Sequence, residues 1–197
     1  RAAALFLVKN IFSFVLTILL MFVNMPYPLQ AIQLSLISSL TIGVPSFFLA
    51  LEPNYARVEG KFMRNVIRRA MPGGLTNIIL VILAGMLTST FNLPDTHLNT
   101  IAVWLLAAVG LITLYHVSKP FTKLRLIVFA AMSAAMLFCL LLIPGFFEIP
   151  AINYQSGLIM VVLLLTAPTL MRFFLLIFDR QVAKHDQRPP REKRRRR

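Results

Sequence analysis

Acidic residues and cysteines are scarce in this 197-residue chain, and this scarcity limits the chemistry that it can carry. Seven residues are Asp or Glu, and the single cysteine, Cys139, lies in an apolar run. One cysteine cannot form an internal disulfide, and a lone buried cysteine usually packs as a small hydrophobic residue. The three histidines show no metal-ligand spacing, so no structural metal is expected. The sequence also lacks a Walker motif, a nucleotide-binding glycine loop and a Ser/His/Asp arrangement, so we expect no catalytic residue in this chain.

Charged residues of both signs are also few, and this points to a membrane protein. They make up 14% of the chain, whereas 58% of the residues are hydrophobic and the mean hydropathy is +0.77. Soluble domains have about 25% charged and 45–50% apolar residues. A net charge of +13 would suggest nucleic acid in a soluble protein. In a membrane protein such a charge sets orientation and attracts anionic lipid, so we expect no nucleic-acid partner.

Long apolar runs dominate the sequence, and they predict an all-α fold. A helix needs about 20 apolar residues to cross the hydrocarbon core. Prolines and glycines separate the runs, including Pro72-Gly73-Gly74 ahead of the third run, whose helix has room to extend back toward Arg69. We therefore predict a polytopic bundle of six transmembrane helices in one domain, residues 1–178. Its spans are 3–24, 29–51, 74–91, 98–117, 124–144 and 155–178.

The connections between these spans alternate in charge, and this alternation predicts the orientation of the protein. The 52–73 and 118–125 loops and the tail at 179–197 are rich in Lys and Arg, whereas the other three loops have none. By the positive-inside rule, both termini then lie in the cytoplasm of a multi-pass protein of the cell membrane. The basic tail is expected to be a disordered cytoplasmic segment. Binding of anionic lipid by the tail is the alternative.

The first cytoplasmic loop has a helical pattern of its own. Basic residues fall on one face of Val58–Ala70 and apolar residues, including Phe62 and Val66, on the other. This pattern favours a helix lying on the inner membrane surface, and a solvated connector is an equally open alternative.

The second span carries the most informative polar residues of the chain. Ser38 and Thr41 share one helix face, and Gly43 and Pro45 follow them. Pro45 has no backbone donor for the carbonyl of Thr41 and crowds that carbonyl. Hydroxyls together with freed carbonyls are the ligands that a dehydrated cation needs inside a membrane, which makes this stretch a candidate cation pathway. A simple proline kink, stabilised by neighbouring hydroxyls, is the alternative.

The first span adds three polar residues at a similar position. Lys9 lies about one and a half turns into the span and is followed by Asn10, and Ser13 shares a helix face with Asn10. An ionisable residue inside a span is costly and suggests a function. The alternative is that Lys9 extends its amine to the cytoplasmic surface, and that Asn10 and Ser13 form interhelical hydrogen bonds.

Three motifs in residues 1–80 resemble the C-terminal membrane half of bacterial P-type cation-transporting ATPases, in particular the calcium-transporting subgroup called cation-transporting ATPase E. They are Arg-Ala-Ala-Ala-Leu-Phe-Leu-Val-Lys-Asn at the start, Gly-Val-Pro-Ser-Phe-Phe-Leu-Ala-Leu-Glu-Pro-Asn in the second span, and Met-Pro-Gly-Gly-Leu-Thr before the third. The resemblance implies that the six spans are membrane helices five to ten of a bacterial inner-membrane pump. It also implies that membrane helices one to four and the catalytic domains, which use Mg-ATP, lie upstream, so that this chain alone is no enzyme.

The resemblance also implies which residues line the ion pathway. In calcium pumps of this family, helix five supplies an Asn and a Glu, and those positions match Asn10 and Ser13. Helix six supplies Asn, Thr and Asp, and those positions match Ser38, Thr41 and Ile42. Two carboxylates are thus replaced, whereas a divalent cation prefers oxygens with some negative charge. The missing charge would come from helix four of the pump, or fewer ions would bind, and Lys9 would serve as a counter-charge in the ion-free state.

Two functions are consistent with these observations. The first is the ion-pathway half of an ATP-driven pump for Ca²⁺ or another divalent cation. The second is a non-enzymatic scaffold or permease subunit that is complete in itself. An upstream reading frame containing Asp-Lys-Thr-Gly-Thr would favour the first, and a start codon directly before Arg1 would favour the second.

Overall fold

The computed structural model is built from helices, which confirms the predicted all-α class. The backbone is described for residues 2–23, 27–51, 62–119 and 122–186. Side chains are described for residues 10, 13–22, 27–51, 71–119 and 122–178. The helices are α1 (Ala2–Val23), α2 (Ala31–Ser38), α3 (Val44–Leu51), α4 (Phe62–Thr90), α5 (Asp95–Ser118), α6 (Lys123–Leu142) and α7 (Tyr154–Asp186). A π-helical turn, Ser39–Gly43, joins α2 to α3, and a short 3₁₀ turn, Pro144–Phe147, follows α6.

Five helical segments are long and apolar enough to cross a membrane. They are Ala31–Leu51, which unites α2, the π-turn and α3, then Met71–Thr90, Asp95–Ser118, Lys123–Leu142 and Tyr154–Phe178. Helix α1 contains a shorter apolar stretch, Ser13–Phe22, within the part of the helix whose side chains are described. The structure therefore supports a multi-pass membrane protein. The count of six spans and the side on which the termini lie remain predictions.

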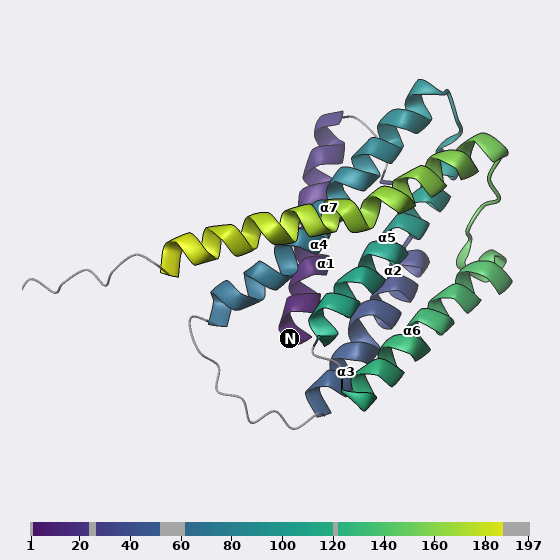
Figure 1. Ribbon diagram of the computed structural model, residues 1–197. Helices are drawn as coiled ribbons and strands as arrows, with labels where there is room; N and C mark the ends of the chain where they lie inside the picture. The colour runs from purple at the N-terminus through teal and green to yellow at the C-terminus, as the bar shows by residue number, and fades with distance from the viewer. Residues whose placement is uncertain (1, 24–26, 52–61, 120–121, 187–197) are drawn as a thin grey trace, which may run out of the picture.

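The helices run alternately in opposite directions (Figure 1). The start of α1, the end of α3, the start of α4, the α5–α6 connection and the end of α7 all lie toward one end of the bundle. The connections that follow α1, α4 and α6 lie toward the other end. We call the first of these two ends the basic end and the second the opposite end. Helix α7 continues to Asp186, past residue 178, where the predicted tail begins.

The break predicted at Pro72-Gly73-Gly74 is wrong, because α4 continues through it. Pro72 has no N–H for the carbonyl four residues earlier, and the Thr76 hydroxyl donates to another group, the carbonyl oxygen of Pro72 itself, at 2.7 Å. Pro72 and both glycines are buried, and small residues let neighbouring helices approach closely. From Phe62 onward, the loop segment for which a surface helix and a solvated connector were both open is helical and forms the first part of α4. Residues 58–61 lie outside the described residues.

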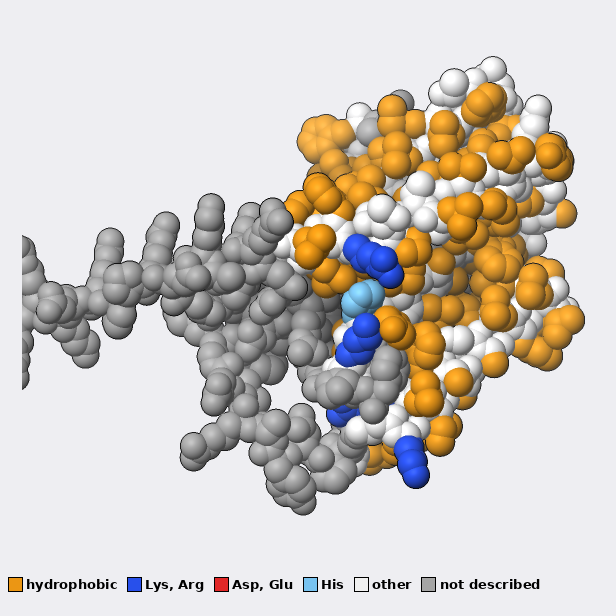
Figure 2. Space-filling model, in the orientation of Figure 1, with side chains coloured by type: hydrophobic (Ala, Val, Ile, Leu, Met, Phe, Trp, Pro, Cys, Tyr) orange, Lys and Arg blue, Asp and Glu red, His pale blue; other side chains and the backbone are white. Residues whose placement is uncertain are grey.

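Helix α5 is the centre of the bundle. Its residues Ala102, Val103 and Leu106 join a core with α1, α2, α4 and α6, whereas Ile101 and Leu105 join a second core with α4 and α7. Helices α6 and α7 lie at the periphery and expose many large apolar side chains, among them Ile127, Phe138, Leu141, Leu165 and Phe173. Figure 2 shows how much of one face is hydrophobic. Such a surface is rare in soluble monomers and is expected where lipid covers the protein.

Candidate cation pathway

The π-turn Ser39–Gly43 ends two residues before Pro45, in the middle of a membrane span. Pro45 has no N–H to donate, and its ring cannot pack against a regular preceding turn. The helix widens here, so that the N–H of Val44 bonds to the carbonyl of Ser39, five residues back. Single π-turns within helices are frequent at functional sites. The backbone is therefore irregular at the place where the sequence predicted freed carbonyls.

Ser38 and Thr41 flank and enter this turn, and both hydroxyls bond within their own helix. Ser38 Oγ donates to the carbonyl of Leu34, and Thr41 Oγ1 donates to the carbonyl of Ile37 at 2.7 Å. A hydroxyl that has donated its proton keeps lone pairs that can accept or ligate. The hydroxyl oxygens of Ser38 and Thr41 can therefore bind a cation through these lone pairs without losing a proton. The same bonds also fit the alternative of hydroxyls that stabilise a kink.

Thr41 points to the central helix. Its side chain is 3% exposed, and a Cβ added at Gly110 of α5 would lie 2.7 Å from Thr41 Cγ2. At Gly43, by contrast, an added Cβ would meet the Ser38 carbonyl oxygen at an ordinary 3.8 Å. Of the two glycines, Gly110 is therefore the one that close packing requires, although the sequence pattern pointed only to Gly43. Pro45 is buried, in accordance with a role in shaping the turn.

Helix α1 contacts the π-turn, as do α5 and α6, so the two spans with predicted pathway residues are neighbours. Asn10 is exposed, and the Ser13 side chain bonds to Tyr27 in the connection after α1. Partial burial of the Tyr27 ring raises the pKa of its phenol, and the bond to Ser13 offsets part of that rise. Lys9 belongs to α1, but its side chain lies outside the described ones. A shared cation site of Asn10, Ser13, Ser38 and Thr41 stays a prediction.

Two buried oxygens that the sequence pattern did not single out have no hydrogen-bond partner. They are Oγ of Ser46, which is 5% exposed, and Oδ1 of Asn77, which is 6% exposed. An unpaired buried polar group costs about 1–3 kcal/mol, so it requires an explanation. Ser46 directly follows Pro45 and extends the polar run of the π-turn into α3. A polar residue in an apolar span was the signal that could have identified it.

The buried Gln33 and the partly buried Asn99 form an amide pair at the opposite end of the bundle. Gln33 Nε2 donates to Asn99 Oδ1 at 2.9 Å and to the carbonyl of Glu148 at 3.0 Å. Its Oε1 accepts from Asn99 Nδ2 at 2.9 Å and from the backbone N–H of Gln30 at 3.0 Å. Asn99 Nδ2 also donates to the carbonyl of Pro28 at 2.7 Å. The pair thus ties the start of α2 to α5 and to the connections before α2 and after α6.

Charged ligands are scarce near the pathway. Within the part of the chain that the structure describes, no three His, Cys, Asp or Glu side chains gather at a common point. The described stretch from Gln33 to Ser46 offers only neutral oxygens to a cation. Inside a membrane, neutral oxygens alone suit a cation less well than a set that includes a carboxylate.

Comparison with known proteins identifies a class that matches these features. The chain shows partial homology, at 27–35% identity, to bacterial cation- and calcium-transporting P-type ATPases. It is 30% identical over 144 residues to the calcium-transporting ATPase CtpE of Mycolicibacterium smegmatis, which covers 66% of this chain and 18% of that protein. It is 27% identical over 133 residues to the "Probable cation-transporting ATPase exp7" of Streptococcus pneumoniae, with 64% and 17% covered. The CtpE protein of Mycobacterium tuberculosis is 35% identical over 85 residues, with 38% and 11% covered.

The chain thus spans less than a fifth of the length of these relatives. No protein-family model matches it, and no solved structure matches it significantly. The comparisons therefore relate this membrane segment to cation-transporting ATPases.

Proposed function

We propose that this chain is the membrane ion-pathway portion of an ATP-driven cation transporter, and that α1 and the segment Ala31–Leu51 line part of the pathway. The π-turn at Ser39–Gly43 carries this proposal, because it interrupts a membrane span beside polar side chains. Interrupted helices with unpaired backbone groups are how membrane transporters bind dehydrated ions. The partial homology to cation-transporting ATPases supports the same assignment.

The transported ion in this proposal is Ca²⁺ or another divalent cation. Two relatives are named calcium-transporting ATPases, and hydroxyl, amide and carbonyl oxygens are hard ligands that such ions accept. Thr41 and Ser38 supply hydroxyl oxygens, and Asn10 and Ser13 supply further oxygens from α1. Ile42 offers no charge, so the negative charge of the site would come from outside this chain. Mg-ATP would be used by catalytic domains that are likewise outside it.

The test compares two buried threonines that differ only in position. Thr41 and Thr113 are each 3% exposed, and each donates to the carbonyl four residues earlier, at 2.7 and 2.8 Å. Thr113 lies in α5, in a different span from the π-turn. Valine at either position keeps the shape of the side chain and removes the oxygen. ATP-driven ⁴⁵Ca²⁺ uptake is measured in membrane vesicles that contain the product of the complete gene.

We expect Thr41→Val to raise the Ca²⁺ concentration for half-maximal uptake about fivefold, as for the loss of roughly 1 kcal/mol of ligand interaction. Thr113→Val should leave this concentration unchanged. Equal effects of the two variants would remove Thr41 from the pathway. A complete gene product without ATP-driven cation uptake of any kind would contradict the whole proposal.

A further inference from the structure

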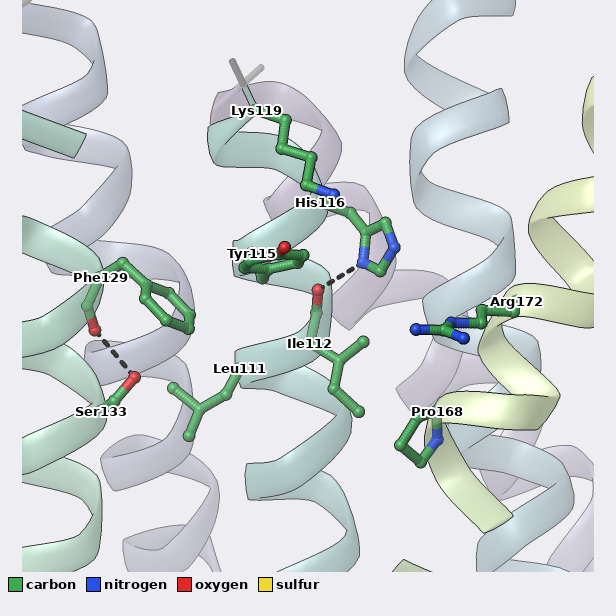
Figure 3. Close-up of a pocket in the computed structure, with 9 residues that line it drawn as sticks. All are labelled: Leu111, Ile112, Tyr115, His116, Lys119, Phe129, Ser133, Pro168 and Arg172. Atoms are coloured by element: carbon green, nitrogen blue, oxygen red, sulfur yellow. Dashed lines mark hydrogen bonds between the residues drawn. The ribbon is translucent and has the colours of Figure 1, made fainter. Parts of the chain in front are cut away.

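A pocket of about 380 Å³ opens between α5, α6 and α7 at the basic end of the bundle. Helix α5 forms its floor, and α6 and α7, which each pack on α5, form its two walls. Figure 3 shows the nine residues that line it. Three of them, His116, Lys119 and Arg172, are basic, and none of the nine is acidic. We call this site the basic pocket.

The basic groups converge on one side of the basic pocket. Arg172 reaches in from α7, and His116 lies between Arg172 and Lys119 on α5 (Figure 3). Figure 2 shows a row of Lys or Arg and His side chains beside hydrophobic surface on this face of the molecule. Among the residues whose side chains are described, the acids are Asp95 and Glu148, and both belong to the opposite end of the bundle. No acidic side chain among the described ones therefore neutralises the basic pocket.

Two contacts hold these groups in position. The Nζ of Lys119 lies 4.4 Å above the centre of the Tyr115 ring, a cation–π distance. The Nδ1 of His116 donates to the carbonyl oxygen of Ile112 at 2.8 Å, so Nδ1 carries a proton and Nε2 is the ring nitrogen that remains for a ligand. Arg172 adds a guanidinium, whose planar donors match a phosphate.

The other side of the basic pocket is apolar. Leu111, Ile112 and Pro168 line it toward the middle of the bundle, and Phe129 lines it from α6 (Figure 3). Along α5 the lining therefore changes from apolar at Leu111 to basic at Lys119. A phospholipid has the same order, with acyl chains toward the membrane centre and a phosphate at the surface. A soluble anion such as free phosphate would leave the apolar half of the pocket unused.

We propose that the basic pocket binds the phosphate headgroup of an anionic phospholipid and that the acyl chains lie against the exposed apolar faces of α6 and α7. Basic pockets between membrane helices on the cytoplasmic side bind such headgroups, and the basic end is the one that the positive-inside rule assigns to the cytoplasm. The bound lipid would contact both peripheral helices, α6 and α7, and would thereby link them. The described lining of the basic pocket comes from α5, α6 and α7 before residue 179, where the predicted basic tail begins.

Native mass spectrometry of the purified chain in detergent tests the proposal, with equal amounts of phosphatidylglycerol or phosphatidylcholine added. We expect phosphatidylglycerol to bind at least about fivefold more tightly than phosphatidylcholine. Lys119→Gln and Arg172→Gln should each weaken the binding of phosphatidylglycerol about fivefold and leave the binding of phosphatidylcholine unchanged. Lys123→Gln is the matched control, because Lys123 is exposed at the start of α6 and does not line the basic pocket.

Three further measurements separate the possible sources of the effect. Arg172→Lys keeps the charge and should retain most of the preference, which shows that loss of binding in Arg172→Gln is not misfolding. A chain truncated after Asp186 should keep the preference, and its loss there would place the site in the tail and overturn the proposal. Competition by inorganic phosphate at the same concentration as the lipid would identify a soluble-anion site and overturn it as well. Equal binding of phosphatidylglycerol to the wild type, Lys119→Gln and Arg172→Gln would also overturn it.

Discussion

Thr41 in the π-turn occupies the space that a side chain on Gly110 of α5 would need. A Cβ added at Gly110 would lie 2.7 Å from Cγ2, 3.2 Å from Cβ and 3.3 Å from Oγ1 of Thr41. The interrupted helix therefore lies against the backbone of the central helix at this point. Because α5 is packed on both sides, Thr41 cannot retreat without moving α5 or the π-turn.

Gly110→Ala should therefore destabilise the protein. Overpacking a tight interface typically costs about 1–3 kcal/mol, which outweighs the roughly 0.5–1 kcal/mol that alanine otherwise gains over glycine in a helix. The measurement is the apparent melting temperature of the purified chain in detergent. Gly157→Ala in α7 is the control, since the nearest atom to its added Cβ is Ile152 Cδ1 at 3.9 Å. We expect Gly157→Ala to be neutral or stabilising.

A second substitution identifies the clash. Thr41→Ser removes Cγ2, the atom at 2.7 Å, but keeps the hydroxyl and its bond to Ile37. Added to Gly110→Ala, it should restore part of the lost stability, although Cβ and Oγ1 of residue 41 remain close. A melting temperature that drops further in the double variant would show that the methyl group introduced by Gly110→Ala does not displace Thr41.

The amide pair predicts a strong coupling between Gln33 and Asn99. Gln33 is 0% exposed and makes four hydrogen bonds, so Gln33→Met keeps its length but removes the bonds of this side chain to the Asn99 amide, the Glu148 carbonyl and the Gln30 N–H. We expect a loss of about 2–4 kcal/mol, because unpaired buried groups add their desolvation cost to the lost bonds. The apparent free energy of unfolding in mixed detergent micelles measures it.

A double-mutant cycle checks that this loss comes from the pair. Asn99→Leu alone should also destabilise, and the double variant should lose clearly less than the sum of the two. Gln155→Met, at an exposed position in the first turn of α7, should change stability by less than about 0.5 kcal/mol. Strict additivity of Gln33→Met and Asn99→Leu would mean that the two amides do not act as a unit.

The sequence predicted the helices well where the deciding signal is local. An apolar run of span length depends only on the residues within it, so five predicted spans coincide with helices of membrane-crossing length. The disturbance before Pro45 was also predictable, because the missing N–H affects its own helix. Pro72 has the same local chemistry, yet α4 passes through it, because burial among other helices compensates there. That compensation depends on tertiary structure, which the local pattern does not contain.

The candidate site was predictable only in part for the same reason. Ser38 and Thr41 stood out as polar residues beside a proline, but the partner of Thr41 is Gly110, 69 positions away in the sequence. No periodicity links these two residues. The basic pocket likewise combines Lys119, at the end of one span, with Arg172, inside another. Nothing in the sequence pattern links these two residues, and only the packing of α7 on α5 brings them to one site.

Ser46 provides a prediction in which stability and function change in opposite directions. Its buried Oγ has no partner, so Ser46→Ala removes an unsatisfied group and should stabilise the chain by about 1 kcal/mol. Ser156 is the matched control, because it is also buried but lies 2.7 Å from Nδ1 of His97. Ser156→Ala should destabilise the chain by about 1–2 kcal/mol, since it leaves the His97 nitrogen unpaired.

The same two variants distinguish a structural oxygen from an ion ligand. If the Ser46 hydroxyl is left unpaired because it serves a cation in transit, Ser46→Ala should weaken ATP-driven Ca²⁺ uptake by the complete gene product while the protein becomes more stable. Unpaired polar groups that persist at a cost are expected where function uses them. Ser156→Ala should lower the melting temperature without changing the Ca²⁺ concentration for half-maximal uptake. A more stable Ser46→Ala protein with wild-type uptake would exclude Ser46 from the pathway and confine the cation ligands of this segment to the π-turn and the residues before it.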